Sequence, residues 1–146
     1  MFRFSRKMIY AVEAVLYVAL NGRESPVQSR AITRRQEIPE RYLEQALQRL
    51  VRVGILKGVR GPRGGYQLAR PADRITLGEV VGVIRAMDNG EEESADGSDL
   101  GRDLVMPIFE SLDAEVMERL DRITIGELVA RAEGRSESVA RILERA

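Results

Sequence analysis

The sequence contains no cysteine and no histidine. These two absences exclude disulfides, thiolate-bound zinc, cysteine-ligated iron–sulfur clusters, histidine-ligated haem and every Ser-His or Cys-His nucleophile. Carboxylates alone remain as metal ligands, and they favour hard cations such as Ca²⁺ and Mg²⁺. We therefore expect neither an enzyme nor a protein with a resident cofactor or metal.

Long hydrophobic runs are also missing, and no apolar stretch approaches the roughly 18 residues of a membrane span. The N-terminus is basic, but Glu13 interrupts its apolar part and no small-residue cleavage site follows. It is therefore typical of a helix rather than of a signal peptide. The 146 residues have room for one core and an appended helix. We expect a cytoplasmic protein with no membrane partner.

The net charge of zero hides a strong asymmetry between the two halves of the chain. Residues 1–75 carry 15 Lys and Arg against 6 Asp and Glu, and residues 76–146 carry 8 against 17, so the halves have formal charges of +9 and −9. Such a division is typical of a basic surface for a polyanion and an acidic part that stays away from it. The alternative is a pair of unequally charged solvated faces.

Hydrophobic spacing predicts three helices in the first part of the chain, over residues 5–21, 27–36 and 39–53. Ser5 can cap the first helix, and Asn21-Gly22 can end it in a left-handed turn. Pro39 suits the first turn of the third helix, and Gly54 terminates it. The inward stripe of the third helix is Leu43, Ala46, Leu47 and Leu50, and its outward positions are Arg41, Glu44, Gln45, Gln48 and Arg52.

The stretch Gly-Val-Arg-Gly-Pro-Arg-Gly-Gly-Tyr-Gln-Leu-Ala-Arg-Pro, residues 58–71, is too rich in glycine and proline for the interior of a helix or a strand. It predicts a hairpin with strands at 55–59 and 66–69 and a loop at 60–65. The order helix, short helix, turn, helix, hairpin predicts a winged helix-turn-helix, whose third helix enters the major groove of DNA. Glycines would let the loop approach phosphates, with Arg60 and Arg63 supplying charge. The alternative is an ordinary hairpin turn.

A sequence echo joins the two halves: Arg74-Ile-Thr-Leu-Gly-Glu-Val-Val81 recurs as Arg122-Ile-Thr-Ile-Gly-Glu-Leu-Val129. Both copies carry the Thr-x-x-Glu capping box, so helices should start at Thr76 and Thr124. We interpret the echo as recurrent capping chemistry rather than as duplication. Between the copies, residues 88–99 are acidic and lack large apolar side chains, which predicts a flexible loop without the spacing of a calcium-binding loop.

Beyond that loop, apolar residues recur every three or four positions from Leu104 to Ile123, which predicts a long amphipathic helix with Pro107 in its first turns or at a kink. Little of the chain is left to cover this helix, so a second copy is the expected partner. The alternative is packing against the first helix. We thus expect a mainly α-helical fold with a small β-hairpin. It comprises a winged helix-turn-helix domain over 1–75, a connecting helix and acidic loop over 76–99, and a dimerisation helix with a C-terminal tail over 100–146.

These motifs together resemble the IscR/NsrR/CymR-type family of bacterial transcription regulators. The resemblance covers nearly the whole chain, and the stretches that carry it are Tyr10-Ala-Val, Tyr42-Leu-Glu-Gln45, Val59-Arg-Gly-Pro-Arg-Gly-Gly-Tyr66 and Ile123-Thr-Ile-Gly-Glu-Leu128. It implies a homodimer that binds palindromic promoter DNA, usually as a repressor. It also implies that Arg41, Glu44 and Gln45 read bases, that Arg60 is the wing arginine, and that Gln28 and Ser29 contact backbone phosphate.

Arginines add a second, charge-based set of predicted DNA contacts: Arg30, Arg34, Arg35, Arg60 and Arg63 would neutralise phosphates. Arg and Gln on the outward face of the third helix are able to make bidentate hydrogen bonds to guanine and adenine edges. Against this stand Glu40 and Glu44, because a carboxylate repels the DNA backbone although it can accept from cytosine. The alternative function is a winged-helix module that binds a protein and has lost its operator.

The chain departs from the family pattern in one respect. Many relatives carry three cysteines between the winged domain and the dimer helix, where they hold an iron–sulfur cluster. Here the acidic loop takes their place, and Ile9 stands at the position where some relatives add a further ligand. We therefore predict a regulator without an iron–sulfur cluster. Such a regulator is controlled by a small-molecule or protein effector, or it binds DNA constitutively. An apolar effector would bind near Met8, Met87, Met106 and Phe109, for which core packing is the alternative.

Overall fold

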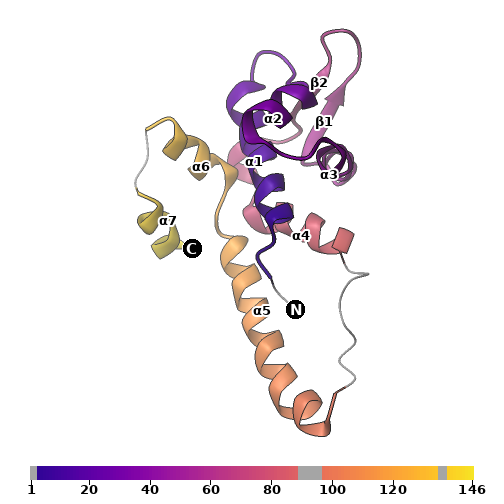
Figure 1. Ribbon diagram of the computed structural model, residues 1–146. Helices are drawn as coiled ribbons and strands as arrows, with labels where there is room; N and C mark the ends of the chain where they lie inside the picture. The colour runs from indigo at the N-terminus through magenta and orange to yellow at the C-terminus, as the bar shows by residue number, and fades with distance from the viewer. Residues whose placement is uncertain (1–2, 89–96, 135–137) are drawn as a thin grey trace.

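A computed structural model describes residues 3–88, 97–134 and 138–146, and these form a mainly α-helical fold with a two-stranded antiparallel hairpin, as predicted (Figure 1). The elements in chain order are α1 (Arg6–Asn21), α2 (Ser29–Gln36), α3 (Glu40–Arg52), β1 (Leu56–Val59), β2 (Gly65–Leu68), α4 (Leu77–Asp88), α5 (Met106–Leu120), α6 (Ile125–Ala132) and α7 (Val139–Arg145). Of the predicted acidic loop, residues 89–96 lie outside the described residues.

Helix α1 runs through the middle of the core and packs against α2, α3, α4, α6 and β2. It begins where the sequence predicts, because the Ser5 hydroxyl accepts a hydrogen bond from the Met8 N–H at 3.3 Å. Its end differs from the prediction: Gly22 has φ of −101° and is not left-handed. Glycine is needed there because a Cβ would lie 2.7 Å from the Val18 carbonyl oxygen, to which the Gly22 N–H donates.

Helices α2 and α3 form the helix-turn-helix. Ile32 of α2 is fully buried, and α3 buries the predicted stripe of Leu43, Ala46, Leu47 and Leu50. Between the helices, Glu37 adopts left-handed backbone angles with φ of 51°, which reverses the chain in a few residues. Pro39 is the N-cap rather than a residue of the first turn, so α3 starts one residue later than predicted. Gly54, with φ of +81°, ends the helix as predicted.

The hairpin pairs β1 with β2 in the register Leu56↔Leu68, Lys57↔Gln67, Gly58↔Tyr66 and Val59↔Gly65. Leu56 of β1 is buried, and its side chain packs the hairpin against the core. The strands are close to the predicted ones, except that Gly65 belongs to β2 and not to the loop.

Helices α4 and α6 complete the same core, which includes Val80 and Ile84 of α4 and Ile125 and Val129 of α6 beside the α1–α3 side chains. Both helices start at the predicted threonines, since Thr76 Oγ1 accepts from the Glu79 N–H and Thr124 Oγ1 from the Glu127 N–H, each at 3.1 Å. The core therefore contains residues from all three predicted segments, 1–75, 76–99 and 100–146. The division of the chain into these segments stays a prediction.

Helix α5 extends away from the core (Figure 1) and has no fully buried residue. A π-helical segment, Gly101–Val105, runs directly into it, since Val105 and Met106 both have right-handed helical backbone angles, and Pro107 follows two residues after that segment. It ends at Leu120, so Ile123 belongs to the connection before α6 and not to the helix. It packs against α4. None of the described helices is long and apolar enough to cross a bilayer.

Candidate nucleic-acid interface

Helices α2 and α3 and the hairpin gather at one end of the molecule, while α5 points away from them (Figure 1). This end holds all the side chains predicted to contact DNA: Gln28, Ser29, Arg30, Arg34, Arg35, Arg41, Glu44, Gln45, Arg60 and Arg63. Ser29 is half-buried and the other nine are exposed. Among the described residues, none of these ten side chains makes a hydrogen bond or an ion pair, so each is available to an incoming ligand.

The outer face of α3 lies opposite its buried leucine stripe. Arg41, Glu44 and Gln45 are exposed there, and so is Gln48, because positions three and four apart share one face of a helix. Arg and Gln at such positions have the donor geometry that guanine and adenine edges require in the major groove. The first turn of α3 also carries Glu40, whose charge the positive end of the helix dipole favours.

Helix α2 presents its own polar groups beside this face. Its N-cap is Gln28, whose side chain makes no capping hydrogen bond, so the amide is available to donate to a phosphate. Arg34 and Arg35 lie in the last turn and are exposed. These side chains are suited to phosphate contacts beside the recognition helix.

The hairpin loop supplies the second arginine pair, Arg60 and Arg63, both exposed. Its tip is a tight turn closed by the Gly64 N–H, which donates to the Gly61 carbonyl at 2.9 Å. A Cβ at Gly64 would lie 2.9 Å from the Arg60 carbonyl carbon, and one at Gly65 would lie 2.6 Å from the Val27 carbonyl carbon. These two glycines are therefore needed for packing within the chain, in addition to any approach to DNA.

A backbone bridge connects the hairpin to the start of α2. The Val27 N–H donates to the Tyr66 carbonyl at 2.9 Å, and the Tyr66 N–H donates to the Val27 carbonyl at 2.8 Å. Val27, directly before Gln28, thus forms a single antiparallel bridge with Tyr66 of β2. It brings Gln28 and Ser29 next to the hairpin.

Tyr42 fixes α3 to α1. Its hydroxyl donates to the Lys7 carbonyl at 2.7 Å, and its ring lies 6.0 Å from that of Tyr10. Burial raises the pKa of the Tyr42 phenol above its ordinary value, and the negative charge of Asp88 adds to the shift. Asp88 also pairs with the Lys7 ammonium at 3.4 Å. The contacts of Tyr42 show that it orients α3 against α1, a role that the Tyr42-Leu-Glu-Gln45 motif by itself does not indicate.

Sequence reasoning misses two further basic side chains at this end. Arg49 is exposed on α3 four residues after Gln45, and this i+4 spacing was the signal that could have revealed it. Lys57 is exposed on β1 and makes no ion pair among the described residues. Arg49 adds positive charge to the face of α3 that carries the predicted contacts, whereas Lys57 lines a recess together with Arg23 and Arg70.

The residues predicted to lie near an apolar effector differ in burial. Met8 is buried in the core and Met87 packs against it, in line with the core-packing alternative, whereas Met106 is half-buried and Phe109 is 46% exposed. A recess of about 370 Å³ lies elsewhere, behind the hairpin. Its lining residues are Val18, Ala19, Gly22, Arg23, Lys57, Gln67, Leu68, Ala69, Arg70 and Pro71.

A helix-turn-helix with an exposed Arg- and Gln-bearing second helix and an arginine-tipped hairpin defines the winged helix-turn-helix class of DNA-binding proteins. Comparison with known proteins gives the family. The model of the Rrf2 family, described as iron-dependent transcriptional regulators, matches residues 4–131, so the chain belongs to the Rrf2 family. It is a DNA-binding transcription regulator, as predicted.

Individual relatives agree with this assignment. The HTH-type transcriptional regulator IscR of Cronobacter sakazakii is 38% identical over 129 residues, covering 87% of this chain and 80% of its own. Among solved structures, T. potens IscR has a TM-score of 0.72 at 30% identity, covering 96% of each chain. CymR (YrzC), the global cysteine regulator of B. subtilis, has a TM-score of 0.66 at 28% identity, covering 90% of this chain and 98% of its own. These relatives are named as regulators, in agreement with the expectation that the chain is not an enzyme.

The family description raises the question of iron. Iron–sulfur clusters are held by cysteine thiolates, with histidine in some centres, and this chain contains neither residue. Within the described part of the chain, no group of three or more Asp or Glu side chains is placed to hold a metal ion. The donor set of this chain therefore does not fit a cysteine-ligated cluster.

Proposed function

We propose that the chain acts as a homodimeric repressor that binds a palindromic operator and holds no iron–sulfur cluster. The observation that carries this proposal is the apolar face of α5 and of the segment before it. Five side chains form that face, which we call the α5 stripe, and they are 45–60% exposed in the single chain: Leu104, Val105, Ile108, Phe109 and Leu112.

A second copy of the chain is the proposed occupant of the α5 stripe. An exposed apolar stripe of this length on a helix marks an interaction surface, and two identical stripes bury each other about a two-fold axis. Two further exposed apolar residues lie close together in the sequence, Phe4 just before α1 and Ile9 in its first turns, 70% and 53% exposed. A two-fold dimer presents two copies of α3, and a palindromic operator mirrors that symmetry.

Within each half-site we assign base reading to Arg41, Glu44 and Gln45, and phosphate contacts to Gln28, Ser29, Arg34, Arg35, Arg60 and Arg63. The availability of these side chains at one end of the molecule supports the assignment. Two arguments support the repressor role. The chain resembles a family whose members usually repress transcription, and a dimer bound across a promoter blocks the binding of RNA polymerase there.

The test is an anisotropy titration with labelled genomic fragments, including the promoter of the chain's own operon. We expect saturable binding that survives excess random duplex and weakens by about 10³–10⁵ between 50 and 200 mM salt, as for roughly 6–10 phosphate contacts. Purified protein should be dimeric by light scattering and should reduce transcription from the bound promoter in vitro.

The exposed carboxylates Glu40 and Glu44 favour the competing function, a module that binds a protein partner. Their charge opposes the DNA backbone unless Glu44 accepts from a cytosine amino group. If excess random duplex abolishes binding to the labelled fragments, or if light scattering shows a monomer, the proposal is refuted and the protein-binding alternative is favoured.

A further inference from the structure

The two copies of the sequence echo lie against each other in the structure. The Leu77 N–H donates to the Ile123 carbonyl and the Ile125 N–H donates to the Ile75 carbonyl, both at 2.8 Å. The bridge they make is antiparallel. Helices α4 and α6 therefore begin side by side, each with its own threonine cap.

Each copy also places an aspartate against the other copy's glycine. A Cβ at Gly78 would overlap the Asp121 carboxylate, whose Cγ lies 2.6 Å from that point, and would lie 2.9 Å from the Asp121 backbone nitrogen. A Cβ at Gly126 would overlap the Asp73 carboxylate in the same way, with its Cγ at 2.9 Å. A carboxylate at the positive end of a helix is favourable, so the two contacts stabilise the junction from both sides.

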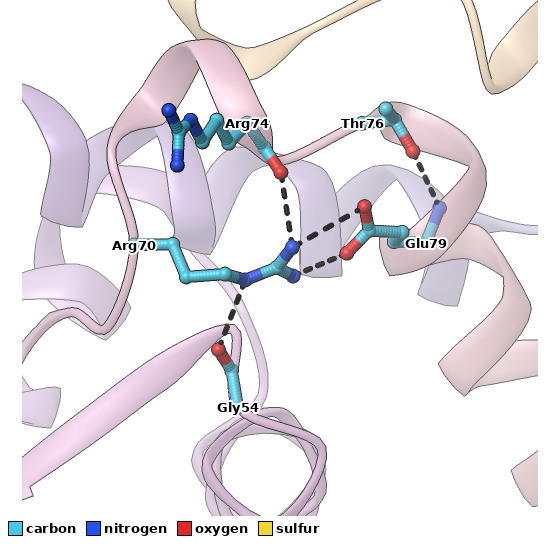
Figure 2. A network of polar contacts seen from close by, with 5 residues as sticks. All are labelled: Gly54, Arg70, Arg74, Thr76 and Glu79. Carbon is cyan, nitrogen blue, oxygen red and sulfur yellow. Dashed lines mark hydrogen bonds and ion pairs between the residues drawn. The ribbon is translucent and has the colours of Figure 1, made fainter.

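Arg70 connects this junction to the recognition helix, as Figure 2 shows. Its Nε donates to the Gly54 carbonyl at 3.2 Å, directly after the end of α3, and its Nη1 donates to the Arg74 carbonyl at 3.0 Å. The guanidinium also pairs with the Glu79 carboxylate in the first turn of α4. One side chain thus fixes the end of α3 to the start of α4.

An ion pair continues the connection to α5. The Nη2 of Arg85 in α4 donates to both carboxylate oxygens of Asp113, at 3.0 and 3.1 Å, and the two side chains are only 23% and 19% exposed. Hydrogen bonds and ion pairs thus connect the end of α3 to α4 through Arg70, and α4 to α5 through Asp113. They restrict movement of these three helices relative to one another.

We propose that Arg70 and Gly78 determine operator specificity through half-site spacing, by holding the recognition helix at a fixed angle to the dimer helix. The inference rests on the proposed homodimer. In a dimer joined through α5, this joint sets the separation and rotation of the two α3 helices. One inserted base pair moves a half-site by about 3.4 Å and turns it by about 34°, so a stiff joint rejects it.

The experiment selects binding sites from a random duplex library with the full-length protein and four variants. Arg70→Ala removes the contacts to Gly54, Arg74 and Glu79, and its control, Arg74→Ala, removes a guanidinium that points away from this network and keeps the carbonyl (Figure 2). Gly78→Ala forces Asp121 to move, and its control, Gly82→Ala in the same helix, meets nothing within 4 Å.

We expect the wild type and both controls to enrich one spacing. Arg70→Ala and Gly78→Ala should enrich at least two, and the affinity ratio between the preferred spacing and one base pair more should fall by roughly 2- to 30-fold. The bases preferred inside each half-site should not change, which separates altered spacing from general loss of binding.

An unchanged spacing preference in folded, dimeric Arg70→Ala and Gly78→Ala would overturn the inference and leave the proposed function intact. Enrichment of single half-sites by the wild type would overturn both. If Arg70→Ala fails to fold by circular dichroism, Arg70→Lys decides the question, because it keeps the charge and loses the fork of donors.

Discussion

Thr76 and Thr124, which are 48 positions apart in the sequence, face each other in an antiparallel backbone bridge, and each caps the helix that follows it. The reciprocal half of the capping box is absent from both copies. Glu79 instead pairs with Arg70, and Glu127 lies 3.9 Å from Arg145. The threonine hydroxyls therefore satisfy the Glu79 and Glu127 N–H groups, and the backbone bridge satisfies those of Leu77 and Ile125.

We predict that Thr76→Ala and Thr124→Ala each lower the free energy of unfolding by about 1 kcal/mol, the usual cost of losing an N-cap. Urea denaturation at one fixed protein concentration measures the change, because the stability of a dimer depends on concentration. Thr33→Ala is the control, since its hydroxyl bonds only to the Arg30 carbonyl within α2 and its loss should cost less than about 0.5 kcal/mol. Equal losses in all three variants would refute the capping role.

Arg60→Ala should weaken binding to specific and random duplexes by a similar factor, because a phosphate contact carries no sequence information. A dimer loses one such contact from each hairpin, so the slope of log affinity against log salt should become shallower by about 2. Anisotropy titrations over a salt series measure the slope. Arg131→Ala removes the same charge from α6 and should leave it unchanged; a similar effect of both variants would place the dominant contacts elsewhere.

Gln45→Ala should instead relax the preference at one base pair of each half-site. A bidentate contact from glutamine to adenine gives about 1–3 kcal/mol of discrimination against a wrong base. Competition titrations with operators substituted at single positions identify the affected base pair, while binding to random duplex should stay close to that of the wild type. If specific and random DNA weaken equally, Gln45 does not read a base.

The sequence predicts those parts of this fold that depend on local periodicity. Leu43, Leu47 and Leu50 recur at helical spacing, and all three are fully buried in α3. Gly22 was misjudged, because a glycine after a helix favours a left-handed end in general, whereas here the nearby Val18 carbonyl requires it. The end of α5 was misjudged at Ile123, which keeps the apolar spacing of the helix but lies in the following bridge.

Long-range pairings account for what the sequence could not show. Local capping chemistry explains Thr76 and Thr124 separately and does not indicate that the two segments touch. The shared aspartates Asp73 and Asp121 were a usable signal, since they extend the echo by one residue before Arg74 and Arg122, outside the capping box. The outward positions of α3 follow directly from its buried stripe, and this spacing predicts the exposed candidate residues. No local pattern predicts the role of Arg70, because its partners Gly54 and Glu79 are 16 and 9 residues away.

Leu112→Glu should convert the dimer into monomers. Leu112 is 50% exposed in the single chain, so the carboxylate costs little there, but in a paired α5 stripe it is buried without a partner at a cost of several kcal/mol. Light scattering measures the mass, and operator binding should weaken with it. Ala114→Glu is the matched control, because Ala114 is exposed two residues further on, about 200° around the helix. A dimeric Leu112→Glu protein would show that another surface joins the two copies.

Tyr42→Phe should change how stability depends on alkaline pH. The pKa of the buried Tyr42 phenol is raised above its ordinary value of 10.0, so below that pH the phenol is protonated in both the folded and the unfolded chain. Above it the unfolded chain loses the proton first, and stability falls with rising pH by up to about 1.4 kcal/mol per unit for each protomer. Tyr42→Phe should remove this part of the decline. At neutral pH it should cost about 1 kcal/mol for the lost hydrogen bond to the Lys7 carbonyl.

Urea denaturation between pH 8 and about 11 measures both effects of Tyr42→Phe. Tyr17→Phe is the control, since its hydroxyl makes no hydrogen bond among the described residues, and a decline that is the same in both variants would assign the alkaline sensitivity to other groups.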